Sequence, residues 1–293
     1  MVKFISEISS NHNRDKSRML DFIQTSAEIG CSAVKFQLFK IEELFAKEIL
    51  TKSKSHRSRK LWELEEELIP FLNEACKKNN IEFGCTPFYS SAVDKLKPYV
   101  DFLKIASYEL LWKELFFKCG NSGIPVMFSI GMANQGEVSS SLKWLLDTLV
   151  DEITVLHCNS AYPTPAEDSN LSAINSLTNL VSSLPNPGKK NINIGYSDHT
   201  VSQAVMYRAI HKYDAKVIEF HIDLDGKGEE FESGHCWLPK NIAEVIRNVN
   251  IGLDVDGEGK IEPTKSEMPD RDWRADPKDG LRPLKKIRKA FSG

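Results

Sequence analysis

The sequence has no long hydrophobic run and no strong excess of charge of either sign. None of its apolar runs approaches the roughly 18 residues that a membrane-spanning helix requires. The first residues, MVKFISEISSNHN, lack the apolar segment of a signal peptide. A net charge of −3 over 293 residues gives no indication of nucleic acid or an anionic membrane as a partner. We therefore expect a cytoplasmic protein that binds neither.

Cysteine motifs are also missing. No two of the six cysteines have C-x-x-C spacing, which argues against a zinc ribbon or a thioredoxin-like redox site. The cysteines are scattered in apolar surroundings, at positions 31, 76, 85, 119, 158 and 236. This pattern is typical of reduced thiols in a cytoplasmic protein.

What the chain does contain is a regular alternation of short β-rich runs and helical stretches. Strands are predicted at Lys3–Ile8, Ala33–Leu38, Ile81–Thr86, Asp101–Ala106, Pro125–Ile130, Glu152–His157, Ile192–Tyr196 and Lys216–Ile222. Helices are predicted at Arg14–Ile29, Arg59–Lys78, Ser90–Leu96, Trp112–Cys119, Gly136–Leu149, Asn170–Leu184, Val201–Tyr213 and Asn241–Leu253. Eight strand–helix units in about 255 residues match the size and period of a (β/α)8 barrel.

A doubly wound open sheet is the alternative for such an alternation. That fold usually has a glycine-rich first turn, whereas the first turn here reads SSNHN. We therefore expect an α/β fold, a (β/α)8 TIM barrel over residues 1–255. A polar C-terminal extension over residues 256–293 is expected to wrap the barrel without forming a second domain. The long connection Phe39–Ser58 is either a lid over the reactive face or a solvated loop with a helical turn of its own.

In a barrel of this kind the reactive side chains stand at the carboxyl ends of the strands. All eight predicted ends carry polar groups. In chain order these are Glu7, Lys35, Gln37, Thr86, Lys104, Ser107, Glu109, Ser129, Ser160, Tyr162, Ser197, His199, Glu219 and His221. Lysines with hydroxyls suit a phosphorylated and carboxylated ligand, and the carboxylates suit proton transfer.

Two of these residues, His199 and His221, end consecutive strands. Neighbouring parallel strands would bring both imidazoles to the same edge, where they could hold one divalent metal.

The two lysines occupy inward positions of their strands. Alternation puts Lys35 and Gln37 on one face, and Lys104 is likewise flanked by apolar neighbours. A lysine inside a barrel is costly without an anionic partner. A bound anion is the simplest partner, and an internal carboxylate such as Glu7 or Glu109 is the alternative.

Eight short stretches form an ordered set of motifs: SEISSNHN, AVKFQLF, CTPFYSSAVDKL, FLKIASYEL, PVMFSIGMA, LHCNSAYPTPAED, NIGYSDHT and VIEFHIDLD. The set runs from Glu7 to about Asp225 and covers most of the barrel. It resembles the sialic acid synthase family, the phosphoenolpyruvate-dependent synthases of N-acetylneuraminate and related nonulosonic acids. A single motif would be weak evidence, whereas eight in the family's order are highly specific.

The resemblance implies a role for each matching residue. Glu7 would be the acid/base carboxylate, and His199 and His221 would bind a divalent metal, manganese or magnesium. Phosphoenolpyruvate would be held by Lys35, Thr86, Lys104, Ser107, Ser129, Ser160 and Ser197. The sugar aldehyde would contact Gln37, Glu109 and Tyr162. The resemblance also implies a homodimer.

The chain departs from the family in the half that contacts the sugar. The family's C-terminal antifreeze-like domain is missing, so Arg274 or Arg282 of the extension would have to supply the arginine with which that domain reaches the sugar. Surface or packing roles are the alternative for both. The segment ESGHCWLP replaces the family's GPDH, and within it His235, or else Glu232, would stand in for a sugar-contacting aspartate.

The predicted reaction is the metal-dependent condensation of phosphoenolpyruvate with an aldose, N-acetylmannosamine or a related sugar. The products would be a 2-keto-3-deoxy sugar acid and phosphate. Two alternatives stay open. One is a Schiff-base pyruvate aldolase that uses Lys104 or Lys35, and the other is a non-catalytic barrel that binds phosphorylated metabolites.

Overall fold

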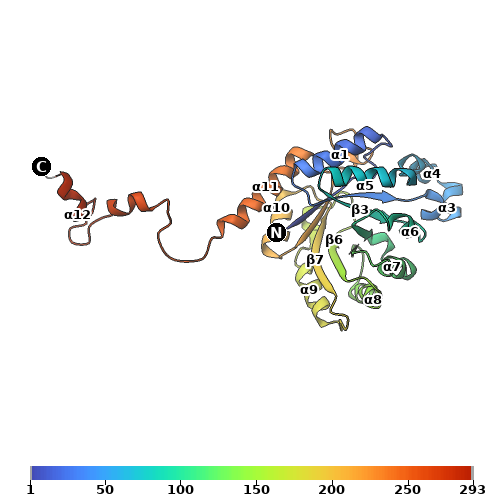
Figure 1. Cartoon of the computed structure of the whole chain (residues 1–293). Coiled ribbons are helices and arrows are strands. Elements are labelled where there is room, and N and C mark those ends of the chain that lie inside the picture. Colours follow the sequence, from blue (N-terminus) through green and yellow to red (C-terminus); the bar gives the residue numbers. More distant parts are fainter. Residues whose placement is uncertain (1, 292–293) are drawn as a thin grey trace. The chain divides into compact units, whose positions relative to one another are not determined.

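Eight parallel strands, joined in chain order, close into a barrel in the computed structural model, which describes residues 2–291 (Figure 1). The strands are β1 Lys3–Glu7, β2 Ala33–Leu38, β3 Glu82–Pro87, β4 Phe102–Ile105, β5 Val126–Ser129, β6 Glu152–Cys158, β7 Asn191–Asp198 and β8 Val217–His221. Every predicted strand is present, and the (β/α)8 barrel is confirmed.

Helices cover the outside of the barrel. They are α1 Lys16–Glu28, α5 Ile69–Lys78, α6 Ala92–Leu96, α7 Lys113–Gly120, α8 Gln135–Leu146, α9 Ala173–Ser183, α10 Gln203–Tyr207 and α11 Pro239–Val255. The prediction of one helix over Arg59–Lys78 is wrong. Two short 3-10 turns, η1 Arg59–Trp62 and η2 Glu66–Leu68, precede α5, whose first turn contains Pro70. Proline suits a helix start because its missing N–H would be unpaired there anyway.

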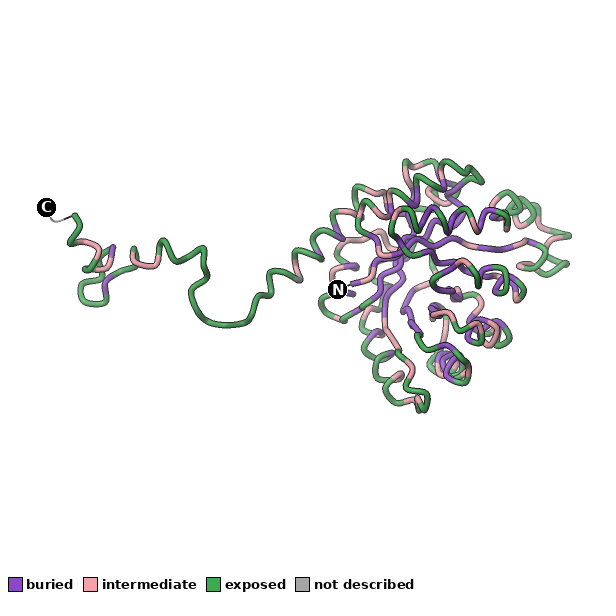
Figure 2. Tube along the Cα trace, viewed as in Figure 1, coloured by how far each residue is buried: buried purple, intermediate pink, exposed green. Residues whose placement is uncertain are grey.

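The interior of the barrel has two levels. The lower level is an apolar plug made of Ile5, Ala33, Phe102, Met127, Leu156 and Val217. A Cβ on Gly84 would lie 2.1 Å from the ring of Phe102, so this position of β3 has to be glycine. Burial is concentrated in the strands and on the inward faces of the helices, while the outer helix faces are exposed (Figure 2).

The strand register fixes what lies above this plug. Two residues beyond Ile5 on β1 comes Glu7, which is paired in register with Lys35 of β2 on one side and with His221 of β8 on the other. Because alternate residues of a strand point the same way, the polar level begins one pleat above the apolar one.

Two connections at this end of the barrel are long. The β2–α5 segment, residues 39–68, contains α2 Ile41–Leu44, α3 Lys47–Lys52 and α4 Lys54–Ser58. The β8–α11 segment, residues 222–238, returns beside the barrel through a parallel bridge between Ile222 and Trp237.

Residues Gly252–Gly293 form a second compact unit. It contains η7 Met268–Trp273, α12 Lys285–Arg288 and η8 Lys289–Phe291. Within it, the Arg288 guanidinium donates to both carboxylate oxygens of Asp279, at 2.6 and 2.8 Å. The predicted wrapping of the barrel, the proposed domain limits and the roles of Arg274 and Arg282 stay predictions. Across residues 2–291 there is no helix with the length and apolar character that crossing a membrane would need.

Candidate active site

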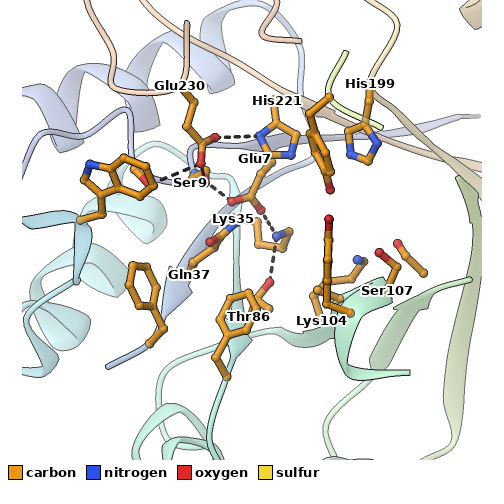
Figure 3. Close-up of a pocket in the computed structure, with 18 of the residues that line it drawn as sticks. Glu7, Ser9, Lys35, Gln37, Thr86, Lys104, Ser107, His199, His221 and Glu230 are labelled. Atoms are coloured by element: carbon orange, nitrogen blue, oxygen red, sulfur yellow. Dashed lines mark hydrogen bonds and ion pairs between the residues drawn. The ribbon is translucent and has the colours of Figure 1, made fainter. Parts of the chain in front are cut away.

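A cavity of about 740 Å³ opens at the carboxyl ends of the strands (Figure 3). Its wall includes all but one of the residues predicted for the site: Glu7, Lys35, Gln37, Thr86, Lys104, Ser107, Glu109, Ser129, Tyr162, Ser197, His199, His221 and His235. The exception is Ser160, whose Oγ lies 2.8 Å from the Oγ of Ser107, a residue that does line the cavity. Of the two residues suggested for the sugar-contacting aspartate, His235 lines the cavity and Glu232 is outside the set of lining residues.

Four charged side chains form a network on the cavity floor. Lys35 pairs with Glu7 and, at 3.2 Å, with Glu219, and Lys104 reaches Glu219 at 3.4 Å. All four residues are at most 4% exposed. Internal carboxylates are therefore partners of both lysines, as the alternative interpretation required, with Glu219 in place of Glu109. Glu219 was predicted only as one of the polar strand ends, and the resemblance gave it no role of its own.

The network has equal numbers of positive and negative side chains, and its burial shifts the pKa values of Lys35 and Glu219. Burial lowers the pKa of Lys35 to about 8, even with Glu219 beside it. Burial alone would raise the pKa of Glu219, but the charges of Lys104 and Lys35 outweigh it and hold that pKa below its usual range. Lys35 Nζ also donates to Thr86 Oγ1 at 2.9 Å. A bound anion would therefore compete with Glu7 and Glu219 for the two lysines.

Glu109 stands apart from this network, on the 3-10 turn Ser107–Glu109 that follows β4. Burial raises the pKa of its carboxyl group to about 7. Its Oε2 is buried and has no hydrogen-bond partner among residues 2–291. A carboxyl group with this pKa can donate a hydrogen bond or accept a proton near neutral pH.

His199 and His221 lie beside each other with ring centroids 5.4 Å apart. The ring of Tyr162 lies 4.2 Å from that of His199, so the tyrosine covers one side of the pair. Burial, and then the neighbouring His221, lowers the pKa of His199 to about 3. Burial also lowers the pKa of His221. Both imidazoles are thus neutral at physiological pH, which is the form that binds a metal.

A carboxylate that the sequence analysis missed lies next to these histidines. Glu230 comes from the β8–α11 segment, and its nearest ligand atom and those of His221, His235 and Cys236 all lie within 4.8 Å of one another. The chemistry of these side chains fits a divalent metal, since imidazole nitrogen and carboxylate oxygen are common ligands. No motif could have found Glu230, because it stands where the sequence leaves the family's pattern.

The roof of the cavity comes from the β2–α5 segment. Arg59 stacks on two aromatic rings, with its guanidinium carbon 5.6 Å from the ring centroid of Phe45 and 5.3 Å from that of Trp62. Trp62 Nε1 donates to Glu229 Oε2 at 3.3 Å, and this hydrogen bond joins the β2–α5 segment to the β8–α11 segment. A lid and a solvated loop were the two alternatives predicted for this segment, and in the structure several of its residues line the cavity.

Comparison with known proteins shows the family of this chain. Residues 22–260 match the NeuB family. The chain belongs to the NeuB family. It is 31% identical to an N,N'-diacetyllegionaminic acid synthase of Campylobacter jejuni over 277 residues, covering 90% of this chain and 80% of the relative. The enzyme of that name from Legionella pneumophila is 29% identical over 282 residues, 91% of this chain and 76% of the relative.

A solved structure is also similar to this chain. The sialic acid synthetase of Leptospira borgpetersenii, solved with citrate, superposes with a TM-score of 0.76 at 30% sequence identity and covers 92% of this chain and 90% of its own. The resemblance inferred from the eight motifs is confirmed, and the chain is an enzyme of the NeuB family.

Proposed function

We propose that this enzyme condenses phosphoenolpyruvate with an N-acylated aldose, in a metal-dependent reaction, to give a 2-keto-3-deoxy sugar acid and phosphate. The observation that carries the proposal is the cavity floor, where Glu7 and two buried lysines share one charge network above an apolar plug. A cavity of about 740 Å³ also has room for two small substrates.

The two lysines would form the part of the site that binds the anionic groups of phosphoenolpyruvate. Lys35 and Lys104 would turn from Glu7 and Glu219 toward the phosphate and carboxylate of phosphoenolpyruvate. Thr86, Ser107 and Ser197 offer hydroxyl donors around them, with Ser129 and, next to Ser107, Ser160. Charge-assisted hydrogen bonds of this kind are strong in a buried site, where they neutralise a substrate that carries several negative charges.

In the reaction, carbon 3 of phosphoenolpyruvate attacks the aldehyde carbon, water adds to carbon 2, and the C–O bond to the phosphate then breaks. Glu7 moves a proton at the reacting centre, since its carboxylate lies against Lys35 and accepts a hydrogen bond from the Ser9 backbone N–H at 2.8 Å. A divalent metal, held by His199 and His221, would polarise the aldehyde oxygen when bound.

Other residues that line the cavity would recognise the sugar. Hydrogen-bonding groups come from Gln37, Glu109, Tyr162 and His235. Arg59 adds a guanidinium that stacks on the ring of Trp62. Relatives named for N,N'-diacetyllegionaminic acid support an aldose with acylamido groups. A homodimer stays a prediction from the resemblance, and a cytoplasmic location stays a prediction from the composition of the sequence.

The Schiff-base alternative gains one observation, the lowered pKa of Lys35, because an imine requires a neutral amine. At a pKa of about 8 the amine is still mostly protonated at neutral pH, and its contacts with Glu7 and Glu219 hold it in the charged form. Borohydride with pyruvate should therefore leave no covalent adduct.

The proposal is tested by incubating the enzyme with phosphoenolpyruvate, Mn²⁺ and a panel of N-acyl hexosamines, and by assaying phosphate together with α-keto acid. We expect phosphate release that depends on one of the sugars, and loss of that release in Lys104→Met. Phosphoenolpyruvate binding with no turnover on any aldose would refute the proposal.

A further inference from the structure

Glu230 occupies a position in the cavity wall that its own contacts do not explain. Its Oε2 lies 3.3 Å from Nδ1 of His221 (Figure 3). The same oxygen lies 3.5 Å from Nε2 of His235. Within the described chain, Oε2 of Glu230 and Nδ1 of His221 are both buried and neither has a hydrogen-bond partner of good geometry. A buried carboxylate of this kind needs donors, and the two imidazoles are the donors that face it.

The carboxylate is held firmly in this place. Its other oxygen, Oε1, accepts a hydrogen bond from Ser9 Oγ at 2.6 Å, and the backbone N–H of Glu230 donates to Asn11 Oδ1 at 2.8 Å. Gly228 packs so closely on Asn11 that an added Cβ would lie 2.4 Å from the same Oδ1. The segment is thus built to aim Glu230 at the histidines.

His199, the other predicted metal ligand, has a matching arrangement. Its Nδ1 lies 2.6 Å from the backbone carbonyl oxygen of Asn159. A carbonyl can only accept, so this nitrogen carries the proton and Nε2 keeps its lone pair. Metal-binding histidines almost always donate their second ring N–H to a carbonyl or a carboxylate, which fixes the tautomer and the ring orientation. Asn159 does this for His199, and the corresponding partner of His221 is Glu230.

We propose that Glu230 is a positioning residue of the metal centre. Its Oε2 accepts the Nδ1 proton of His221, which leaves Nε2 of His221 unprotonated for a divalent metal, and His235 donates to the same oxygen from Nε2. This inference rests on the metal of the proposed function, but it concerns a contact that exists without substrates. Direct coordination by Glu230, together with His221, His235 and Cys236, is the competing arrangement.

The first test needs no metal. In protein labelled with ¹⁵N-histidine, long-range ¹H–¹⁵N spectra report which ring nitrogen of His221 is protonated. We expect the Nδ1–H tautomer in the wild type and a shift toward Nε2–H in Glu230→Leu, which removes the acceptor. His221 as the Nε2–H tautomer in the wild type would overturn the proposal.

The second test measures Mn²⁺ affinity by calorimetry in the absence of substrates. Loss of such a partner costs about 10- to 100-fold in metal affinity, so Glu230→Leu should bind Mn²⁺ that much more weakly. Glu230→Gln keeps an acceptor oxygen and should recover most of the loss. Glu232→Leu, an exposed carboxylate of the same segment, is the matched control and should bind like the wild type. An affinity of Glu230→Leu equal to that of the control would contradict the proposal.

Cobalt distinguishes positioning from coordination. At saturating Co²⁺ the visible absorption bands report the ligand set, and a positioning role predicts the same bands in the wild type and in Glu230→Gln. Changed bands would mean that Glu230 binds the metal itself and would overturn the assignment. Phosphate release by the wild-type enzyme is assayed separately, so failure of the proposed reaction and failure of this inference give different results.

Discussion

The two halves of the cavity come from different parts of the chain. The floor is built by strand residues, among them Glu7, Lys35 and Glu219, whose directions follow from the alternation of inward and outward side chains. The roof and one wall are built by the β2–α5 and β8–α11 segments, which bring Arg59, Trp62 and Glu230 to the cavity. The strands thus carry the residues proposed for the chemistry, and the two segments carry residues proposed to position the metal and the sugar.

The largest effect is expected in the strand-built floor, at Glu7. Glu7→Gln removes the group that transfers the proton, and general acid–base catalysis contributes about 10²- to 10⁴-fold to a rate. We expect kcat to fall by about 10³-fold while phosphoenolpyruvate still binds, as measured by phosphate release and by calorimetry. A kcat within tenfold of the wild type would show that Glu7 is not the acid/base residue.

Glu219→Gln should have the next largest effect, this time on stability. It leaves Lys104 buried without its carboxylate, and breaking a buried ion pair by removing one partner costs about 3 to 5 kcal/mol. We expect a loss of about 3 kcal/mol in urea unfolding, and a larger rise in Tm on addition of phosphate than the wild type shows, because the anion replaces the lost charge. Glu82→Gln, which removes the partner of Lys3 at the partly exposed opposite end, should cost less than about 1 kcal/mol. Equal losses in the two variants would argue against the network.

Glu109→Gln should produce a smaller, pH-dependent effect. Burial raises the pKa of Glu109 from its ordinary value of 4.5 to about 7, so the folded protein holds more protons than the unfolded chain between these values. Stability therefore falls as the pH rises through this window. The variant mimics the protonated form and should be more stable than the wild type at pH 8 by on the order of 2 kcal/mol, but equally stable at pH 4.5.

This difference is measured by thermal unfolding at the two pH values. Glu114→Gln, at an exposed position of α7, should change neither value by more than about 0.5 kcal/mol. A gain for Glu109→Gln that is the same at both pH values would mean that its carboxyl group is not protonated near neutral pH in the folded protein.

The smallest effect is expected in the roof, at Arg59. Arg59→Ala removes a guanidinium stacked on Phe45 and Trp62, a contact worth about 1 kcal/mol. We expect the KM for the aldose to rise several-fold and the KM for phosphoenolpyruvate to stay the same. Lys60→Ala, which removes a neighbouring exposed cation paired with Glu42 at 2.5 Å, should change neither. An equal rise in both KM values would place Arg59 outside the sugar half.

Sequence reasoning was strongest where the period of the structure is short and regular. Strand alternation predicted the inward direction of Lys35 and Gln37. The eight strand–helix units predicted the barrel, and the ordered motifs predicted the family. It was weakest in the long segments. The start of α5 had a local signal in Pro70 that the prediction of one long helix passed over. The position of Glu230, in contrast, depends on tertiary contacts such as the hydrogen bond from its backbone to Asn11, 219 residues earlier.

The most direct test of the proposed reaction follows the bridging oxygen of phosphoenolpyruvate, the atom between carbon 2 and phosphorus. With ¹⁸O at this position, condensation with C–O cleavage predicts that phosphate appears only when the aldose is present and that the label leaves with the phosphate. Phosphate release without the aldose, or label retained in the keto acid, would contradict the account.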